Sequence, residues 1–65
     1  MTAPALPNLI SVREFAERLS ISSKTVRRLI DSGQLPIHRI GGQIRIAETD
    51  AARFVARRRQ VGGHR

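Results

Sequence analysis

The stretch Ser22-Ser-Lys-Thr-Val-Arg-Arg-Leu-Ile-Asp-Ser-Gly33 decides the fold, because it predicts a short helix with one apolar and one basic face. Three apolar side chains follow the i, i+3, i+4 spacing that places residues on one side of a helix: Val26, Leu29 and Ile30. Polar side chains fall on the opposite side: Ser23, Lys24, Arg27 and Arg28. We therefore expect one face to pack on a core and the other to enter the major groove of DNA.

Both ends of this predicted helix carry residues typical of helix ends. Ser22 is a favoured N-cap, and Ile21 before it can pack onto Val26 as a hydrophobic staple. Gly33 suits the left-handed position that follows a helix.

Length and composition indicate one small domain. The chain has 65 residues, for which folding buries about 60% of the surface. It has no cysteine, so disulfides and thiolate zinc sites are excluded and a reducing cytoplasm is the expected compartment. The predicted core consists of Ile10, Phe15, Leu19, Ile21, Val26, Leu29, Ile30, Leu35, Ile40, Ile44, Ile46, Phe54 and Val55.

The charge balance points to a polyanionic partner. Twelve basic residues face five acidic ones, giving a formal net charge of +7. Nucleic acid is the first candidate. With double-stranded DNA as the expected partner, the expected location is cytoplasmic and nucleoid-associated. A membrane partner is not expected, because no helix is long or apolar enough to lie on a bilayer. Residues 1–8 have no basic n-region, so we do not expect a secretion signal there.

A second helix is predicted just before the first. Ser11 and Glu14 form a capping-box pattern, and apolar side chains at helical spacing follow, up to about Leu19. Only residues 20–22 separate the two helices, which predicts a helix-turn-helix. The alternative is a helical pair whose basic face is merely solvated.

Residues 38–46 predict a β-hairpin at Gly41-Gly42, with two competing registers. A two-residue turn pairs Ile40 with Gln43, whereas a three-residue turn pairs Ile40 with Ile44. We prefer the three-residue turn, because the other register exposes an isoleucine at roughly 1.5 to 3 kcal/mol. Arg39 and Arg45 then lie side by side on the outer face, which a phosphate between them would favour. Alternatively, their stems simply cover the strands.

A third helix is predicted over 48–60, with acids at its start and Arg57, Arg58 and Arg59 at its end, as the helix dipole favours. This arginine run either contacts phosphates, with Arg57 and Arg58 as candidates, or only solubilises the terminus. The predicted organisation is a disordered lead-in over 1–8, a domain over 9–60 and a disordered tail over 61–65.

No catalytic or metal-binding pattern is present. His38 and His64 have no third ligand, and no carboxylate pair lies beside a plausible base. Gly41-Gly42 lacks the phosphate-loop pattern. We expect no enzymatic activity, no cofactor and no small-molecule ligand.

Several segments together resemble the excisionase-type, MerR-like winged helix-turn-helix domains, over Leu9 to about Gln60. These segments are Ile10-Ser-Val-Arg-Glu-Phe-Ala-Glu-Arg-Leu19, Ser22-Ser-Lys-Thr-Val-Arg27, Ser32-Gly-Gln-Leu-Pro36, Arg39-Ile-Gly41 and Arg45-Ile46. The fold class implied is mainly α with a small β-hairpin: a helix-turn-helix, a two-stranded wing and a third helix.

The resemblance implies a recognition helix in the major groove and a wing reaching the neighbouring minor groove. On the recognition helix, the implied DNA contacts are Ser22, Ser23, Lys24, Thr25, Arg27 and Arg28. On the wing they are Arg39, Gly41, Gly42, Gln43 and Arg45.

The sequence departs from the family pattern in two places. Such domains often have Ser or Thr at the N-cap of the third helix, where this sequence has Ala47, so we expect that helix to start raggedly or from Thr49. The long dimerising helix of MerR-type regulators is absent, which disfavours an effector-sensing activator.

The function favoured by the resemblance is a recombination directionality factor, which binds repeated sites and assists a tyrosine-type integrase in excision. A small transcriptional regulator of a mobile element is the alternative. RNA binding is less favoured because both aromatic residues, Phe15 and Phe54, are assigned to the core. A protein-only adaptor would be indicated by failure to bind any duplex at low salt.

Overall fold

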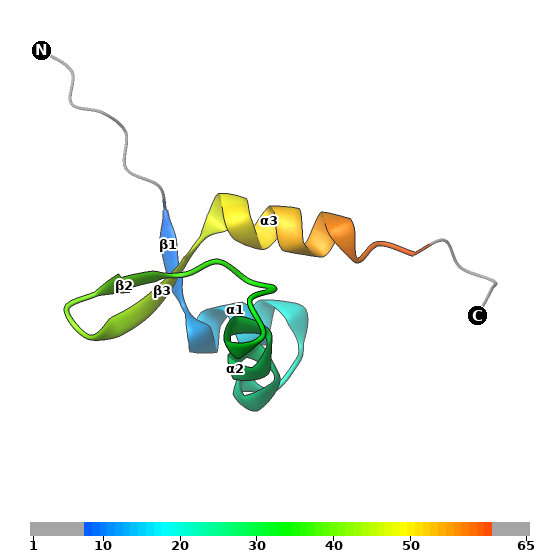
Figure 1. Cartoon of the computed structure of the whole chain (residues 1–65). Coiled ribbons are helices and arrows are strands. Elements are labelled where there is room, and N and C mark those ends of the chain that lie inside the picture. The colour runs from blue at the N-terminus through cyan, green and yellow to red at the C-terminus, as the bar shows by residue number, and fades with distance from the viewer. Residues whose placement is uncertain (1–7, 61–65) are drawn as a thin grey trace, which may run out of the picture.

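A computed structural model describes residues 8–60 and shows three helices around a small sheet (Figure 1). The elements in order are β1 (Leu9–Ser11), α1 (Val12–Leu19), α2 (Ser23–Asp31), β2 (His38–Ile40), β3 (Gln43–Ala47) and α3 (Glu48–Arg57). This is a winged helix-turn-helix, so the predicted fold class is confirmed. The predicted tail, and the predicted lead-in except Asn8, lie outside the described residues.

The two serine caps are confirmed. Ser11 Oγ accepts the backbone N–H of Glu14 at 3.0 Å, and Ser22 Oγ accepts that of Thr25 at 3.0 Å. The Glu14 carboxylate is engaged elsewhere, since it accepts a hydrogen bond from Arg18 at 2.7 Å. Each helix therefore begins where a local side chain satisfies one of its unpaired amides.

Both helices of the helix-turn-helix end in a left-handed turn. After α2, Gly33 has φ 80°, and the amides of Gly33 and Gln34 donate to the carbonyls of Ile30 and Leu29, each at 3.0 Å. After α1, Ser20 takes the same role with φ 58°, and Ile21 N–H donates to the Ala16 carbonyl at 3.0 Å. These paired bonds are the Schellman arrangement, which turns the chain sharply.

Ser20 is the one non-glycine residue with positive φ among residues 8–60. This conformation costs an L-residue about 1 to 2 kcal/mol, and glycine avoids that cost. Glycine also makes the unfolded chain more flexible, which lowers the stability of the fold by about 0.5 to 1 kcal/mol. Ser20→Gly should therefore stabilise the domain by roughly 0.5 to 1 kcal/mol. Urea unfolding measures this, with Ser20→Ala as the matched control that keeps a Cβ. Equal stability of the two variants would contradict the expectation.

The sheet has three antiparallel strands in the order β1-β3-β2. Strand β1 was not predicted: it pairs with β3 so that Ile10 lies opposite Ile46 and Ser11 opposite Arg45. The Asn8 carbonyl extends this pairing by accepting the Glu48 amide at 2.8 Å. The start of α1 is therefore held directly beside the hairpin.

The predicted three-residue hairpin turn is wrong. Ile40 pairs with Gln43 and Arg39 with Ile44, so the turn is the two-residue Gly41-Gly42. Both glycines have positive φ, 56° and 81°, as a type I′ turn requires, and this turn matches the twist of the strands. The hairpin end projects beyond the helices in Figure 1, so there is no core surface there to cover Ile40, which is 55% exposed.

The register also separates the two hairpin arginines. Arg39 lies opposite Ile44 and Arg45 lies opposite His38, so the two side chains leave opposite faces of the sheet. The predicted side-by-side arginine pair is therefore not formed.

The core lies between the sheet and the helices and is centred on Phe15, Val26 and Ile46, each 0% exposed. The rings of Phe15 and Phe54 meet edge to face with centroids 5.9 Å apart, which joins α1 to α3. The other buried members of the cluster are Ile10, Ala16 and Leu35. Two residues predicted for the core are instead on the surface: Ile40, and Val55 at 49% exposure.

Helix α3 follows β3 without a connecting loop. Its N-cap is Ala47, as expected, and no side chain caps it. The predicted ragged start or start at Thr49 is not observed, because the helix begins at Glu48, whose amide is bonded to Asn8. It ends at Arg57 rather than near Gln60. Arg18 ties α1 to α3 through Glu48 at 3.0 Å.

Candidate nucleic-acid interface

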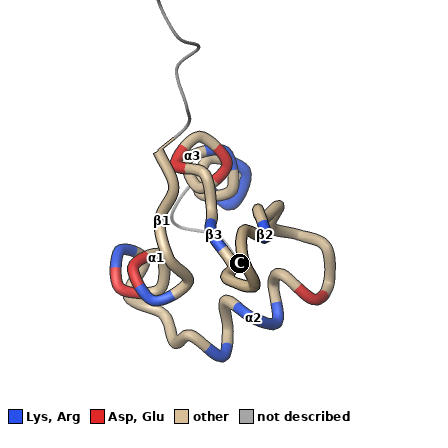
Figure 2. Tube along the Cα trace, turned by 90° about the vertical axis from the view of Figure 1, so that its left-hand side faces the viewer, with Lys and Arg blue, Asp and Glu red and all other residues tan. Residues whose placement is uncertain are grey.

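One side of α2 carries uncompensated positive charge. Ser23, Lys24, Arg27 and Arg28 are exposed while Val26 on the other side is buried, as the spacing predicts. The ion pairs found within residues 8–60 use the cations of Arg13 and Arg18. Figure 2 shows the Lys and Arg positions of α2 along the lower edge of the molecule, with α3 at the top. The cations of α2 therefore face solvent without an acidic partner in this part of the chain.

Ser22 and Thr25 serve the helix start. Their hydroxyls are 2.9 Å apart, and Ser22 Oγ also accepts the Thr25 amide. Both residues are exposed. They lie at the end of α2 where unpaired N–H groups and the positive end of the helix dipole favour an anion.

An open groove of about 330 Å³ runs between α2, the hairpin and the start of α1. It brings together Arg27 of α2 and Gly42, Gln43 and Arg45 of the hairpin, four predicted contact residues from two separate segments. Its other lining residues are Ser11, Val12, Arg13 and Ile44. A groove lined by like charges attracts anions, because its positive potentials add.

The hairpin arginines differ in how they are held. Arg45 donates to the Ile44 carbonyl at 2.8 Å and to the side-chain oxygen of Gln43, so its guanidinium lies along β3 with further N–H donors unused. Arg39 is exposed and does not line the groove. Gly41 lies at the exposed tip. Of the predicted wing contacts, Arg45 is the one whose guanidinium is positioned by its neighbours.

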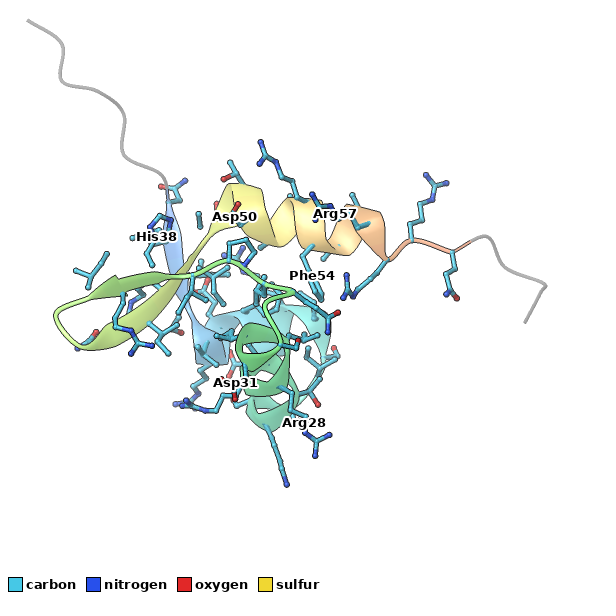
Figure 3. All side chains as sticks on the ribbon, viewed as in Figure 1. Arg28, Asp31, His38, Asp50, Phe54 and Arg57 are labelled. Atoms are coloured by element: carbon cyan, nitrogen blue, oxygen red, sulfur yellow. The ribbon has the colours of Figure 1, made fainter. Side chains whose placement is uncertain are left out.

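The arginines of α3 lie apart from this surface. In Figure 3, Arg57 lies over α3 on the opposite side of the molecule from Arg28 of α2. Arg58 covers the Phe54 ring, with its guanidinium carbon 3.9 Å from the ring centroid, and donates to the Gln34 side chain. The structure therefore does not bring the predicted phosphate contacts Arg57 and Arg58 together with the α2 face, and Arg58 has a packing role.

Arg18 also serves the fold. Hydrogen bonds to two carboxylates raise the pKa of the Arg18 guanidinium, and the bond to Glu14 has a larger effect than the bond to Glu48. Its charge is thus shared between two carboxylates on α1 and α3.

A basic helix in a helix-turn-helix, with a hairpin beside it, is the arrangement by which proteins place a recognition helix in the major groove. Comparison with family models gives a match to the helix-turn-helix domain over residues 9–59. The chain belongs to the helix-turn-helix domain family. Neither the curated proteins nor the solved structures gave a match to it.

As a member of the helix-turn-helix domain family with a basic recognition face, the chain is a DNA-binding protein. Both phenylalanines are buried, so neither offers the stacking surface that single-stranded RNA requires. Within residues 8–60, no group of three His, Asp or Glu side chains is placed to hold a metal ion. None of the helices in that range has the length and apolar character needed to cross a membrane.

Sequence reasoning missed the two polar residues that α1 and its N-cap contribute to the groove, Arg13 and Ser11. Their position depends on the pairing of β1 with β3, which joins residues far apart in sequence. The capping pattern at Ser11 identified a helix start, but no local pattern indicated that this start lies beside the hairpin.

Arg27 is the first residue to test on the helix-turn-helix domain. Because its side chain lies on the groove between helix and hairpin, and an arginine fork can bind a guanine edge, Arg27→Ala should weaken binding by about 1 to 3 kcal/mol and relax sequence preference. Titration of a selected and a random duplex measures both effects. Arg28→Ala, on the side away from the hairpin, is the control and should weaken all sequences alike; parent-like binding by Arg27→Ala would contradict the assignment.

The hairpin arginines should each contribute to affinity without supporting the fold. We expect Arg45→Ala and Arg39→Ala each to weaken duplex binding and to lower the salt slope by about 1, with unchanged melting temperature. Because Gln43 holds the Arg45 guanidinium in place, Arg45→Ala should weaken binding to A·T-rich sites, where the minor groove is narrow, more than Arg39→Ala does. A lowered melting temperature in either variant would show a structural arginine instead.

Proposed function

We propose that this protein is an excisionase-type, MerR-like recombination directionality factor, which binds repeated DNA sites, bends the duplex and assists a tyrosine-type integrase in excision. The observation that carries the proposal is the groove shared by Arg27 of the recognition helix and Arg45 of the hairpin. One strand of a duplex can contact both elements at once, with the helix in the major groove and the hairpin toward the adjacent minor groove.

The size of the domain supports binding in several copies. A single module of this kind buries roughly 600 to 1,000 Å² of its surface on DNA, which limits its specificity. Copies placed side by side on direct repeats raise the effective concentration for one another. A row of hairpins entering successive minor grooves favours a bent duplex.

Sedimentation of the free protein and footprinting on single and repeated sites test the proposal. We expect a monomer in solution, cooperative occupation of direct repeats, and a bent product in circular-permutation gels. Addition of the purified protein should stimulate integrase-dependent excision of a substrate carrying those repeats. A stable free dimer that protects one inverted repeat and leaves the DNA straight would instead support a transcriptional regulator of a mobile element.

A further inference from the structure

Arg13 lies in the first turn of α1, yet the sheet brings it to the groove between the recognition helix and the hairpin. Ser11 pairs with Arg45 across β1 and β3, and Arg13 therefore lines the same groove as Arg27 and Arg45. Three arginines from three elements, α1, α2 and β3, surround one open space of about 330 Å³. The arginines come together only because the fold places α1, α2 and β3 next to one another.

The position of Arg13 is unfavourable for the helix itself. A cation in the first turn opposes the helix dipole, which favours acidic residues there. Its partner, Glu17, lies four residues C-terminal at 3.4 Å, the less favourable order for such a pair. Both side chains are highly exposed, 86% and 68%, so the pair is weak and readily exchanged. Within the fold, Arg13 therefore has little stabilising role.

An anion bound in the groove would make the position of Arg13 favourable. Ser11 Oγ caps the Glu14 amide, while the N–H group of Arg13 has no acceptor within the helix. A phosphate placed there would meet the positive end of the helix dipole and the guanidinium groups of the groove. A residue that is unfavourable for the fold but favourable once a ligand is bound is typical of a binding site, and Arg13 fits this description.

We propose that Arg13 holds a backbone phosphate of the DNA strand that passes between Arg27 of the recognition helix and Arg45 of the hairpin. This inference rests on the proposed binding of a duplex by both elements. Arg27 and Arg45 approach the strand from the two grooves, and Arg13 contacts the phosphate between them. The first turn of α1 is thus part of the DNA-binding surface.

Duplex binding as a function of salt, using the full chain and the tightest duplex selected from a random pool, tests the inference. Arg13→Gln should lower the salt slope by about 1 and weaken binding roughly eightfold at 0.1 M salt, for selected and random duplexes alike. Arg53→Gln is the matched control, because it removes the same charge from α3, where Arg53 lies beside Gln34 and Pro36. It should leave the slope unchanged.

Methylphosphonate substitution, which neutralises one phosphate at a time, locates the contact. At one position, the methylphosphonate should weaken duplex binding by the parent protein and should not weaken binding by Arg13→Gln any further. The melting temperature of Arg13→Gln should be equal to or above that of the parent; a lower one would indicate a structural role and overturn the inference. An unchanged slope in Arg13→Gln, with a parent that binds, also overturns it, whereas a parent that binds no duplex contradicts the proposed function as well.

Discussion

Raising the salt concentration from about 50 to about 200 mM is expected to weaken duplex binding by roughly 250- to 4,000-fold, from a log-log slope of about −4 to −6. The slope follows from the number of phosphates neutralised. Five cations are exposed or only partly buried and have no carboxylate partner on α2 and the hairpin: Lys24, Arg27, Arg28, Arg39 and Arg45. Arg13 adds a sixth. Contacts to about five to seven phosphates give this slope.

Fluorescence anisotropy of a labelled duplex, over a series of salt concentrations, measures the effect. A random duplex of the same length is the control, and its slope should be similar because phosphate contacts carry no sequence information. The selected duplex should keep an advantage over it at every salt concentration. Binding that does not change with salt would contradict the electrostatic basis of the interface.

Local sequence signals predict the boundaries of α2 correctly. Ser22 caps the helix and Gly33 terminates it in the left-handed conformation, and both effects depend only on neighbouring residues. The face that α2 presents is equally local, since Val26 at 0% exposure identifies the buried side and the exposed side follows from the helical period.

The errors arose where long-range pairing decides the structure. Strand β1 has three residues and no alternating pattern, and it exists because Ile10 pairs with Ile46 beside the core. The predicted hairpin register is wrong because it requires a buried Ile40, whereas the hairpin tip extends beyond any surface that could bury this side chain. In the site, the same pairing of β1 and β3 placed Arg13 beside Arg45.

The same distinction applies to Val55. Its i, i+4 spacing from Ala51 predicted a buried residue, but the buried face of α3 is narrower than this pattern suggests. Phe54 turns inward, where Phe15 and the guanidinium of Arg58 cover its ring, and Ala51 packs partly buried against the same core. Burial in so small a domain is limited by how much surface the other elements can cover.

Phe15→Ala is expected to destabilise the domain by about 3 to 5 kcal/mol, the range for a fully buried phenylalanine. Phe15 is 0% exposed and its ring meets Phe54, so truncation leaves a cavity where α1, α3 and the sheet converge. A single small core supplies a stability of roughly 3 to 5 kcal/mol. The variant should therefore be largely unfolded at 25 °C and should bind DNA only weakly, although Phe15 is not on the basic face.

Circular dichroism during urea unfolding measures the loss, and Val55→Ala is the matched control. Because Val55 is 49% exposed, its truncation should change stability by no more than about 0.5 kcal/mol and leave binding intact. Phe15→Leu, which keeps most of the buried volume, should lose less than Phe15→Ala and retain a cooperative transition. If Val55→Ala were as damaging as Phe15→Ala, the core would extend along α3 as the helical spacing predicted, and the exposed position of Val55 would be wrong.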